Sequence, residues 1–116
     1  MKLAINGFGR IGRIFLRTAL ERNINVVAIN DLGDPETLAH LFKYDSVHRG
    51  FKGTVKHVDG ALIINGKKIH VYNKVKPEDL PWASLGIDLV VESTGKFTSR
   101  TGAELHLKAG AKQVLI

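Results

Sequence analysis

The sequence contains no cysteine and no long hydrophobic run. The absence of cysteine excludes disulfide bonds, thiolate metal sites and any catalytic step that uses a cysteine nucleophile of this chain. The longest apolar runs, such as 61–64, are far shorter than the roughly 20 residues that cross a bilayer, so no membrane partner is expected. No apolar segment with a cleavage site follows the N-terminus, so no secretory signal is predicted. Together these absences favour a cytoplasmic location.

The charge is moderately basic, with 17 lysines and arginines against 11 acidic residues and a formal net charge of +6. The basic residues are spread along the chain and are not interleaved with aromatic residues, so nucleic acid is not the expected partner. A small anion such as a phosphate group fits this charge better. The length of 116 residues and the hydrophobic content of 44% indicate one globular domain over residues 1–116.

Short apolar segments alternate with amphipathic ones. Buried strands are predicted at 2–6, 26–30, 88–92 and 112–116, and helices at 10–22, 36–44 and 101–111. A strand, a helix and a second strand within the first 30 residues form a βαβ unit with parallel strands. The fold class predicted is therefore α/β, with a Rossmann-type doubly wound parallel sheet.

Residues 53–73 follow a different pattern. They alternate loosely and contain Asp59-Gly60 and Asn65-Gly66, which are strong hairpin-turn signals. A small antiparallel hairpin insertion is expected there, followed by a connector at 76–86 with a helical turn or two.

Local signals also predict details of two helices. In the last helix, Thr101 is expected as N-cap, with Glu104 completing a capping box and Gly110 ending the helix. In the first helix, the apolar residues of one face are expected to be buried: Ile11, Ile14, Phe15 and Ala19.

Three glycines, Gly7, Gly9 and Gly12, form the pattern G-x-G-x-x-G between the first strand and the first helix. Gly7 would permit a tight turn, Gly9 the approach of a pyrophosphate to the backbone, and Gly12 close packing of helix on strand. Arg10 in the first helical turn opposes the helix dipole by about 0.3–1 kcal/mol, a cost that a bound anion would reverse. The pattern predicts a dinucleotide site, and a merely tight turn is the alternative.

Asp31 ends the second strand, about 20 residues after the last glycine of the pattern, where dinucleotide-binding units place an acidic residue. Its carboxylate can accept hydrogen bonds from the adenosine ribose but would repel a 2′-phosphate. No lysine or arginine follows closely to pair with such a phosphate, so NAD rather than NADP is predicted. The alternative role for Asp31 is that of a plain turn former.

Several stretches closely resemble the N-terminal, NAD-binding part of the glyceraldehyde-3-phosphate dehydrogenase family: AINGFGRIGR, VAINDL, KYDSVH, ESTGKFTSR and HLKAGAKQVLI. The resemblance extends over the whole chain. It implies an NAD-dependent, phosphorylating aldehyde dehydrogenase of glycolysis, which forms 1,3-bisphosphoglycerate from a small-molecule substrate. Members of the family are usually cytoplasmic homotetramers.

The resemblance also implies how NAD is held. The backbone N–H groups of Arg10 and Ile11 would bind the pyrophosphate, Asp31 the ribose, and Leu32 the adenine. Family members often have arginine where this chain has Val75, but the contact there is largely through backbone. The cofactor-binding residues implied are Asn6, Gly7, Gly9, Arg10, Ile11, Gly12, Asp31, Leu32, Val75, Ser93, Thr94, Gly95 and Phe97. No metal site is implied.

The family's catalytic cysteine and histidine match no position of this chain, so no catalytic residue is expected and the chain alone is expected to be inactive. Its histidines are expected to be structural: His40, His48, His57, His70 and His106. The chain would then be a truncated NAD-binding domain that lacks the sixth strand, and the open edge at 112–116 would favour self-association.

Two other functions remain open. Erythrose-4-phosphate dehydrogenase has the same fold and cofactor, although the sequence Asn30-Asp31-Leu32 favours the glyceraldehyde enzyme. A non-catalytic nucleotide-binding module would also fit a chain without a catalytic cysteine.

Overall fold

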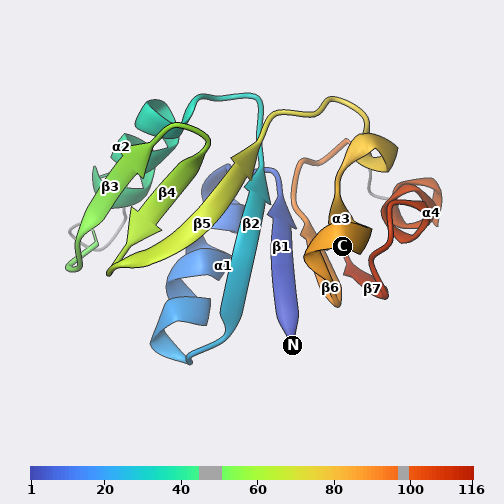
Figure 1. Cartoon of the computed structure of the whole chain (residues 1–116), viewed down its shortest axis with the longest axis horizontal. Helices are drawn as coiled ribbons and strands as arrows, with labels where there is room; N and C mark the ends of the chain where they lie inside the picture. Colours follow the sequence, from blue (N-terminus) through green and yellow to red (C-terminus); the bar gives the residue numbers. More distant parts are fainter. Residues whose placement is uncertain (45–50, 97–99) are drawn as a thin grey trace.

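A computed structural model describes residues 1–44, 51–96 and 100–116, and it contains one mixed sheet (Figure 1). The seven strands of these residues lie in the order β3-β4-β5-β2-β1-β6-β7. The strands β5, β2, β1, β6 and β7 are parallel to their neighbours in this run. Strand β4 pairs in antiparallel fashion with β3 on one side and with β5 on the other. The strands are β1 (Lys2–Asn6), β2 (Asn25–Asn30), β3 (Val55–Val58), β4 (Ala61–Ile64), β5 (Lys67–Tyr72), β6 (Leu89–Glu92) and β7 (Gln113–Leu115). The parallel part has the strand order of a Rossmann-type domain, which confirms the predicted fold class.

Strand β5 belongs to both parts of the sheet. It pairs with β4 as the last strand of the predicted hairpin insertion, and it pairs in parallel with β2 as the third strand of the doubly wound order. Both hairpin turns lie where the sequence places them, with Asp59-Gly60 between β3 and β4 and Asn65-Gly66 between β4 and β5. Asn65 and Gly66 both have positive φ, at 52° and 82°. The insertion therefore extends the parallel sheet instead of interrupting it.

Helices cover both faces of the sheet. They are α1 (Arg10–Glu21), α2 (Pro35–Tyr44), the 3-10 turn η1 (Pro77–Asp79), α3 (Trp82–Leu85) and α4 (Arg100–Lys108). Alternate residues of β1 enter separate apolar clusters: Ile5 packs in the cluster that contains Leu16 of α1, and Ala4 in the one that contains Trp82 of α3. Within the described residues, no helix is long and apolar enough to cross a membrane.

The predicted buried face of α1 is partly wrong. Ile11 and Ile14 are 64% and 53% exposed, and the buried residues of the helix are Gly12, Leu16 and Ala19. A Cβ on Gly12 would lie 2.2 Å from the carbonyl oxygen of Gly7. Because only glycine fits there, Gly12 must face the strand, and this rotation turns Ile11 and Ile14 outward.

The end of α4 is as predicted, but its start is not. Gly110 has a φ of +114°, its N–H donates to the Leu107 carbonyl at 3.0 Å, and the Ala111 N–H donates to the His106 carbonyl at 3.1 Å. These bonds form a Schellman motif. Thr101 is the second residue of the helix, so it is not the predicted N-cap.

We expect Gly110→Ala to destabilise the domain more than Gly60→Ala. Both residues have positive φ, but an added Cβ would lie 2.4 Å from the Ala83 Cβ at Gly110 and would meet nothing within 4 Å at Gly60. Backbone strain alone should cost about 1–2 kcal/mol at Gly60, and overpacking should raise the loss to about 3 kcal/mol at Gly110. Urea unfolding of the two variants measures both losses of unfolding free energy. Equal losses at the two positions would contradict the packing of the end of α4 against α3.

Candidate functional site

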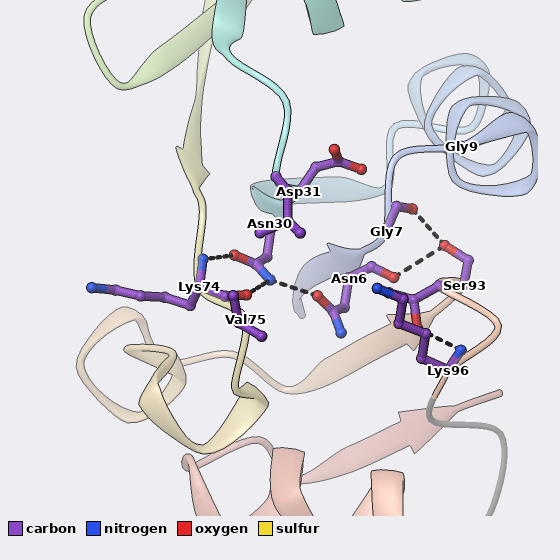
Figure 2. A pocket seen from close by; sticks show the side chains of 11 residues that line it. Asn6, Gly7, Gly9, Asn30, Asp31, Lys74, Val75, Ser93 and Lys96 are labelled. Atoms are coloured by element: carbon purple, nitrogen blue, oxygen red, sulfur yellow. Dashed lines mark hydrogen bonds between the residues drawn. The ribbon is translucent and has the colours of Figure 1, made fainter.

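A crevice of about 340 Å³ opens at the carboxyl ends of the parallel strands. Its walls come from the ends of β1, β2 and β6 and from the segment after β5 (Figure 2). This is the edge at which open α/β sheets bind their ligands. The lining residues are Asn6, Gly7, Gly9, Asn30, Asp31, Leu32, Lys74, Val75, Ser93, Thr94 and Lys96.

The three glycines of the turn differ in what requires them. Gly7 has a φ of +97°, and a Cβ there would lie 2.8 Å from the Thr94 nitrogen. A Cβ on Gly12 would lie closer still, 2.2 Å from the Gly7 carbonyl oxygen. Packing therefore dictates both. Gly9 has an ordinary φ of −80°, and a Cβ there would meet nothing within 4 Å. The fold does not require glycine at position 9, and its absent side chain leaves the backbone open to the crevice.

The N-terminus of α1 lies at this open position. Gly9 is the N-cap residue, with no side chain to cap the helix, and the first turn of α1 has no acidic residue. Gly9, Arg10 and Ile11 are exposed. The unpaired N–H groups and the positive end of the helix dipole are therefore available to an anion.

Asp31 connects the turn to the end of β2. Its Oδ2 accepts a hydrogen bond from the Phe8 N–H at 2.7 Å, and its Oδ1 accepts one from the Gly33 N–H at 2.9 Å. Each carboxylate oxygen has a second lone pair, so Asp31 can still accept hydrogen bonds from a ligand in the crevice.

Buried amides join the strand ends beneath the crevice. Asn30 donates from Nδ2 to Asn6 Oδ1 at 2.7 Å and to the Lys74 carbonyl at 2.9 Å, and its Oδ1 accepts from the Lys74 N–H at 2.8 Å. Ser93 donates from Oγ to the Gly7 carbonyl at 2.6 Å (Figure 2). The walls of the crevice are thus fixed to one another by hydrogen bonds.

Glu92 is a buried carboxylate at the end of β6. Its Oε1 accepts from Asn6 Nδ2 at 2.6 Å and lies 2.7 Å from His106 Nε2, and its Oε2 accepts from the backbone N–H and the hydroxyl of Thr94 at 2.9 and 2.6 Å. Burial raises the pKa of Glu92, but the hydrogen bonds from His106, Thr94 and Asn6 outweigh it and hold the pKa below its ordinary value.

The structure brings most of the predicted cofactor residues together. Those that line the crevice are Asn6, Gly7, Gly9, Asp31, Leu32, Val75, Ser93 and Thr94. Arg10, Ile11 and Gly12 follow Gly9 in the chain but do not line the crevice, and Gly12 packs against the Gly7 carbonyl below the turn. Gly95 is not among the lining residues, and Phe97 lies outside the described residues, as does His48.

Sequence reasoning missed three lining residues: Asn30, Lys74 and Lys96. Asn30 could have been found, because a polar residue at the end of a buried strand signals the crevice edge. Lys74 follows β5, whose place beside β2 was not explicit in the sequence. None of the described histidines lines the crevice.

Residues 1–100 match the protein family described as glyceraldehyde 3-phosphate dehydrogenase, NAD binding domain. The chain is 57% identical to glyceraldehyde-3-phosphate dehydrogenase of Thermotoga maritima, over 99% of this chain and 35% of the relative. It is 56% identical to the Mycoplasma pneumoniae enzyme of the same name, over 100% of this chain and 35% of the relative. The chain thus spans about a third of the length of these curated relatives.

The lowered pKa of Glu92 predicts a loss of stability in acid. Its stabilising effect should be complete above about pH 4.3, the ordinary glutamate value, and should disappear as the pH falls through the lower pKa of the folded state. Glu92→Gln should therefore flatten the decline in unfolding free energy below pH 4.3, measured by urea titration. Glu104→Gln, which removes an exposed carboxylate from α4, should keep the wild-type slope. If the unfolding free energy declined equally steeply in Glu92→Gln and in the wild type, the lowered pKa of Glu92 would be contradicted.

Proposed function

The chain belongs to the glyceraldehyde-3-phosphate dehydrogenase family, and we propose that its crevice holds NAD for the oxidation of glyceraldehyde 3-phosphate by the whole protein. The observation that carries this proposal is the open N-terminus of α1. Gly9 leaves the backbone uncovered there, although no packing contact requires glycine at this position. When bound, NAD accepts the hydride from the substrate. The residues of this chain bind and orient it.

The pyrophosphate of NAD is proposed to lie against the first turn of α1. The N–H groups of Arg10 and Ile11 donate to it, and the exposed Arg10 adds a positive charge beside it. The unfavourable position of a cation at a helix N-terminus supports this placement, because a bound anion turns the repulsion into attraction. Gly7 and Gly12 maintain the turn that aims these groups.

The adenosine half is proposed to lie between the ends of β2 and β5. Asp31 accepts hydrogen bonds from the ribose, and its charge disfavours the extra phosphate of NADP. Leu32 and Val75 both line the crevice and are 61% and 72% exposed. Adenine placed against them would cover this apolar surface. The position of Val75 supports a contact that does not need the arginine common in the family.

The wall formed by the segment after β6 is proposed to support the rest of the dinucleotide. The hydrogen bonds of Ser93 to Gly7 and of Thr94 to Glu92 support this placement, because they join the wall to the turn and to the buried carboxylate. Asn6 occupies the floor between the two walls. The contributions of Gly95 and Phe97 stay predictions.

The covalent chemistry is proposed to need the rest of the protein. Phosphorylating aldehyde oxidation in this family uses a cysteine nucleophile, and this chain has no cysteine. We therefore propose that residues 1–116 form the NAD-binding domain and do not catalyse the reaction alone. A cytoplasmic location and a homotetrameric assembly complete the proposal.

Thermal unfolding with added NAD tests the cofactor assignment. At an NAD concentration of 100 times its dissociation constant, the unfolding free energy should rise by about 2.7 kcal/mol. NADP at the same concentration should give a clearly smaller rise, because Asp31 repels its 2′-phosphate. No rise at millimolar NAD would refute the cofactor site, and equal rises with both would refute the role of Asp31.

Gly9→Ala and Gly12→Ala separate binding from folding. A methyl group at position 9 meets no protein atom, so Gly9→Ala should unfold like the wild type yet bind NAD about tenfold more weakly, because it obstructs the pyrophosphate. Gly12→Ala should lose about 3 kcal/mol of stability through the clash with the Gly7 carbonyl. Urea unfolding and NAD titration by calorimetry measure both effects. Wild-type affinity in Gly9→Ala would show that the pyrophosphate lies elsewhere.

A further inference from the structure

A continuous chain of side-chain contacts runs across the sheet beneath the crevice. It begins at the backbone after β5, crosses the ends of β2, β1 and β6, and ends between α4 and α3. Its members in order are Lys74, Asn30, Asn6, Glu92, His106 and Trp82. We refer to these six residues as the transverse chain. Within it, Asn6, Asn30, Glu92, His106 and Trp82 are all buried.

The direction of every hydrogen bond at the His106 end is fixed by Trp82. The indole Nε1 can only donate, and it lies 3.0 Å from His106 Nδ1, so Nδ1 must accept. The ring proton therefore sits on Nε2, which donates to Glu92 Oε1 at 2.7 Å. Asn6 Nδ2 lies 3.3 Å from the same Nε2, but both atoms are donors that converge on one carboxylate oxygen. This contact is therefore not a hydrogen bond.

Glu92 receives donors from two sides and can satisfy them only as a carboxylate. His106 and Asn6 donate to Oε1, and the backbone and hydroxyl of Thr94 donate to Oε2. A neutral amide would offer an acceptor on one side only. The same requirement fixes the orientation of Asn6, whose Oδ1 must then face Asn30.

We propose that Glu92 and His106 are positioning residues for NAD, which act on the cofactor only through Asn6 and Thr94. Neither side chain of the pair is exposed, and neither lines the crevice. Asn6 and Thr94 both line it, Asn6 at the floor and Thr94 on the wall after β6, and Glu92 binds both. One buried carboxylate thus sets the distance between the floor and this wall, and His106 holds that carboxylate in place. This inference rests on the proposed function of the crevice as an NAD site.

The transverse chain also links the crevice to a spectroscopic probe. Trp82 is the only tryptophan of the sequence, it is fully buried, and it does not line the crevice. Its indole N–H reports the hydrogen bond to His106. A ligand that shifts Asn6 or Thr94 should therefore change the indole signal without touching Trp82.

Two substitutions of His106 separate its two hydrogen bonds. His106→Gln can keep a donor directed at Glu92, because its Nε2 reaches the position of the histidine Nε2, but it loses the acceptor for Trp82. His106→Asn keeps an acceptor for Trp82 at the position of Nδ1, but it is too short to donate to Glu92. Each variant leaves one buried partner without its hydrogen bond, so the pair forms a matched comparison in stability.

The expected results differ between binding and spectroscopy. His106→Asn should weaken NAD binding about tenfold, as expected for a lost hydrogen bond to a charged group, and should keep the indole hydrogen bond. His106→Gln should bind NAD within about twofold of the wild type and should lose the indole hydrogen bond, seen as an upfield shift of the indole proton. Calorimetry and proton–nitrogen correlation spectra of the 116-residue chain provide these readouts.

Equal loss of NAD affinity in the two variants, or a greater loss in His106→Gln, would show that His106 acts through packing alone and would overturn the proposal. The wild-type chain gives a second test that does not depend on variant folding: NAD should shift the Trp82 indole signal, and an unchanged signal at saturation would also overturn the proposal. A wild-type chain that binds no NAD would instead refute the proposed function, and this inference with it.

Discussion

The rest of the site depends on one close approach of backbone to backbone, where the turn after β1 lies against the loop after β6. At Gly7 there is no room for a side chain, because the backbone of Ser93 and Thr94 occupies that space. The approach is held by hydrogen bonds on both sides: the Gly7 N–H donates to the Asn30 carbonyl at 2.8 Å, and the Ser93 N–H donates to the Asn6 carbonyl at 2.8 Å. Because the turn is fixed in this way, α1 begins at the edge of the crevice, where its N-cap residue Gly9 is one of the lining residues.

The strand ends have a composition different from that of the strand centres. Leu3, Ala4 and Ile5 in the middle of β1 are apolar, whereas the last residues of β1, β2 and β6 are the buried polar residues Asn6, Asn30 and Glu92. Buried polar groups are costly unless they are hydrogen-bonded, and here each is bonded to its neighbour across the sheet. The polar row therefore forms a defined floor for a ligand, and the apolar clusters below it provide the stability that tolerates a buried carboxylate.

Sequence reasoning predicted the features that are encoded locally. The alternation of strands and helices, the glycine turn after β1 and the Asn65-Gly66 hairpin depend on residues close together in the sequence, and the structure has all three. The remaining features depend on distant contacts. The outward orientation of Ile11 and Ile14 follows from the fit of Gly12 against the Gly7 carbonyl, and the pairing of β5 with both β4 and β2 depends on the order of the whole sheet. Glu92 and His106 were not linked in the sequence, because only the packing of α4 brings them together.

The central claim is that the backbone at the start of α1 receives the pyrophosphate of NAD. The most direct test is the titration of the isotopically labelled chain with NAD, followed by the amide chemical shifts of Gly9, Arg10 and Ile11. These three amides should show the largest changes in the chain and should saturate together, with smaller changes at Asp31. Unchanged amides at Gly9, Arg10 and Ile11 in a chain whose other amides respond to NAD would contradict the claim.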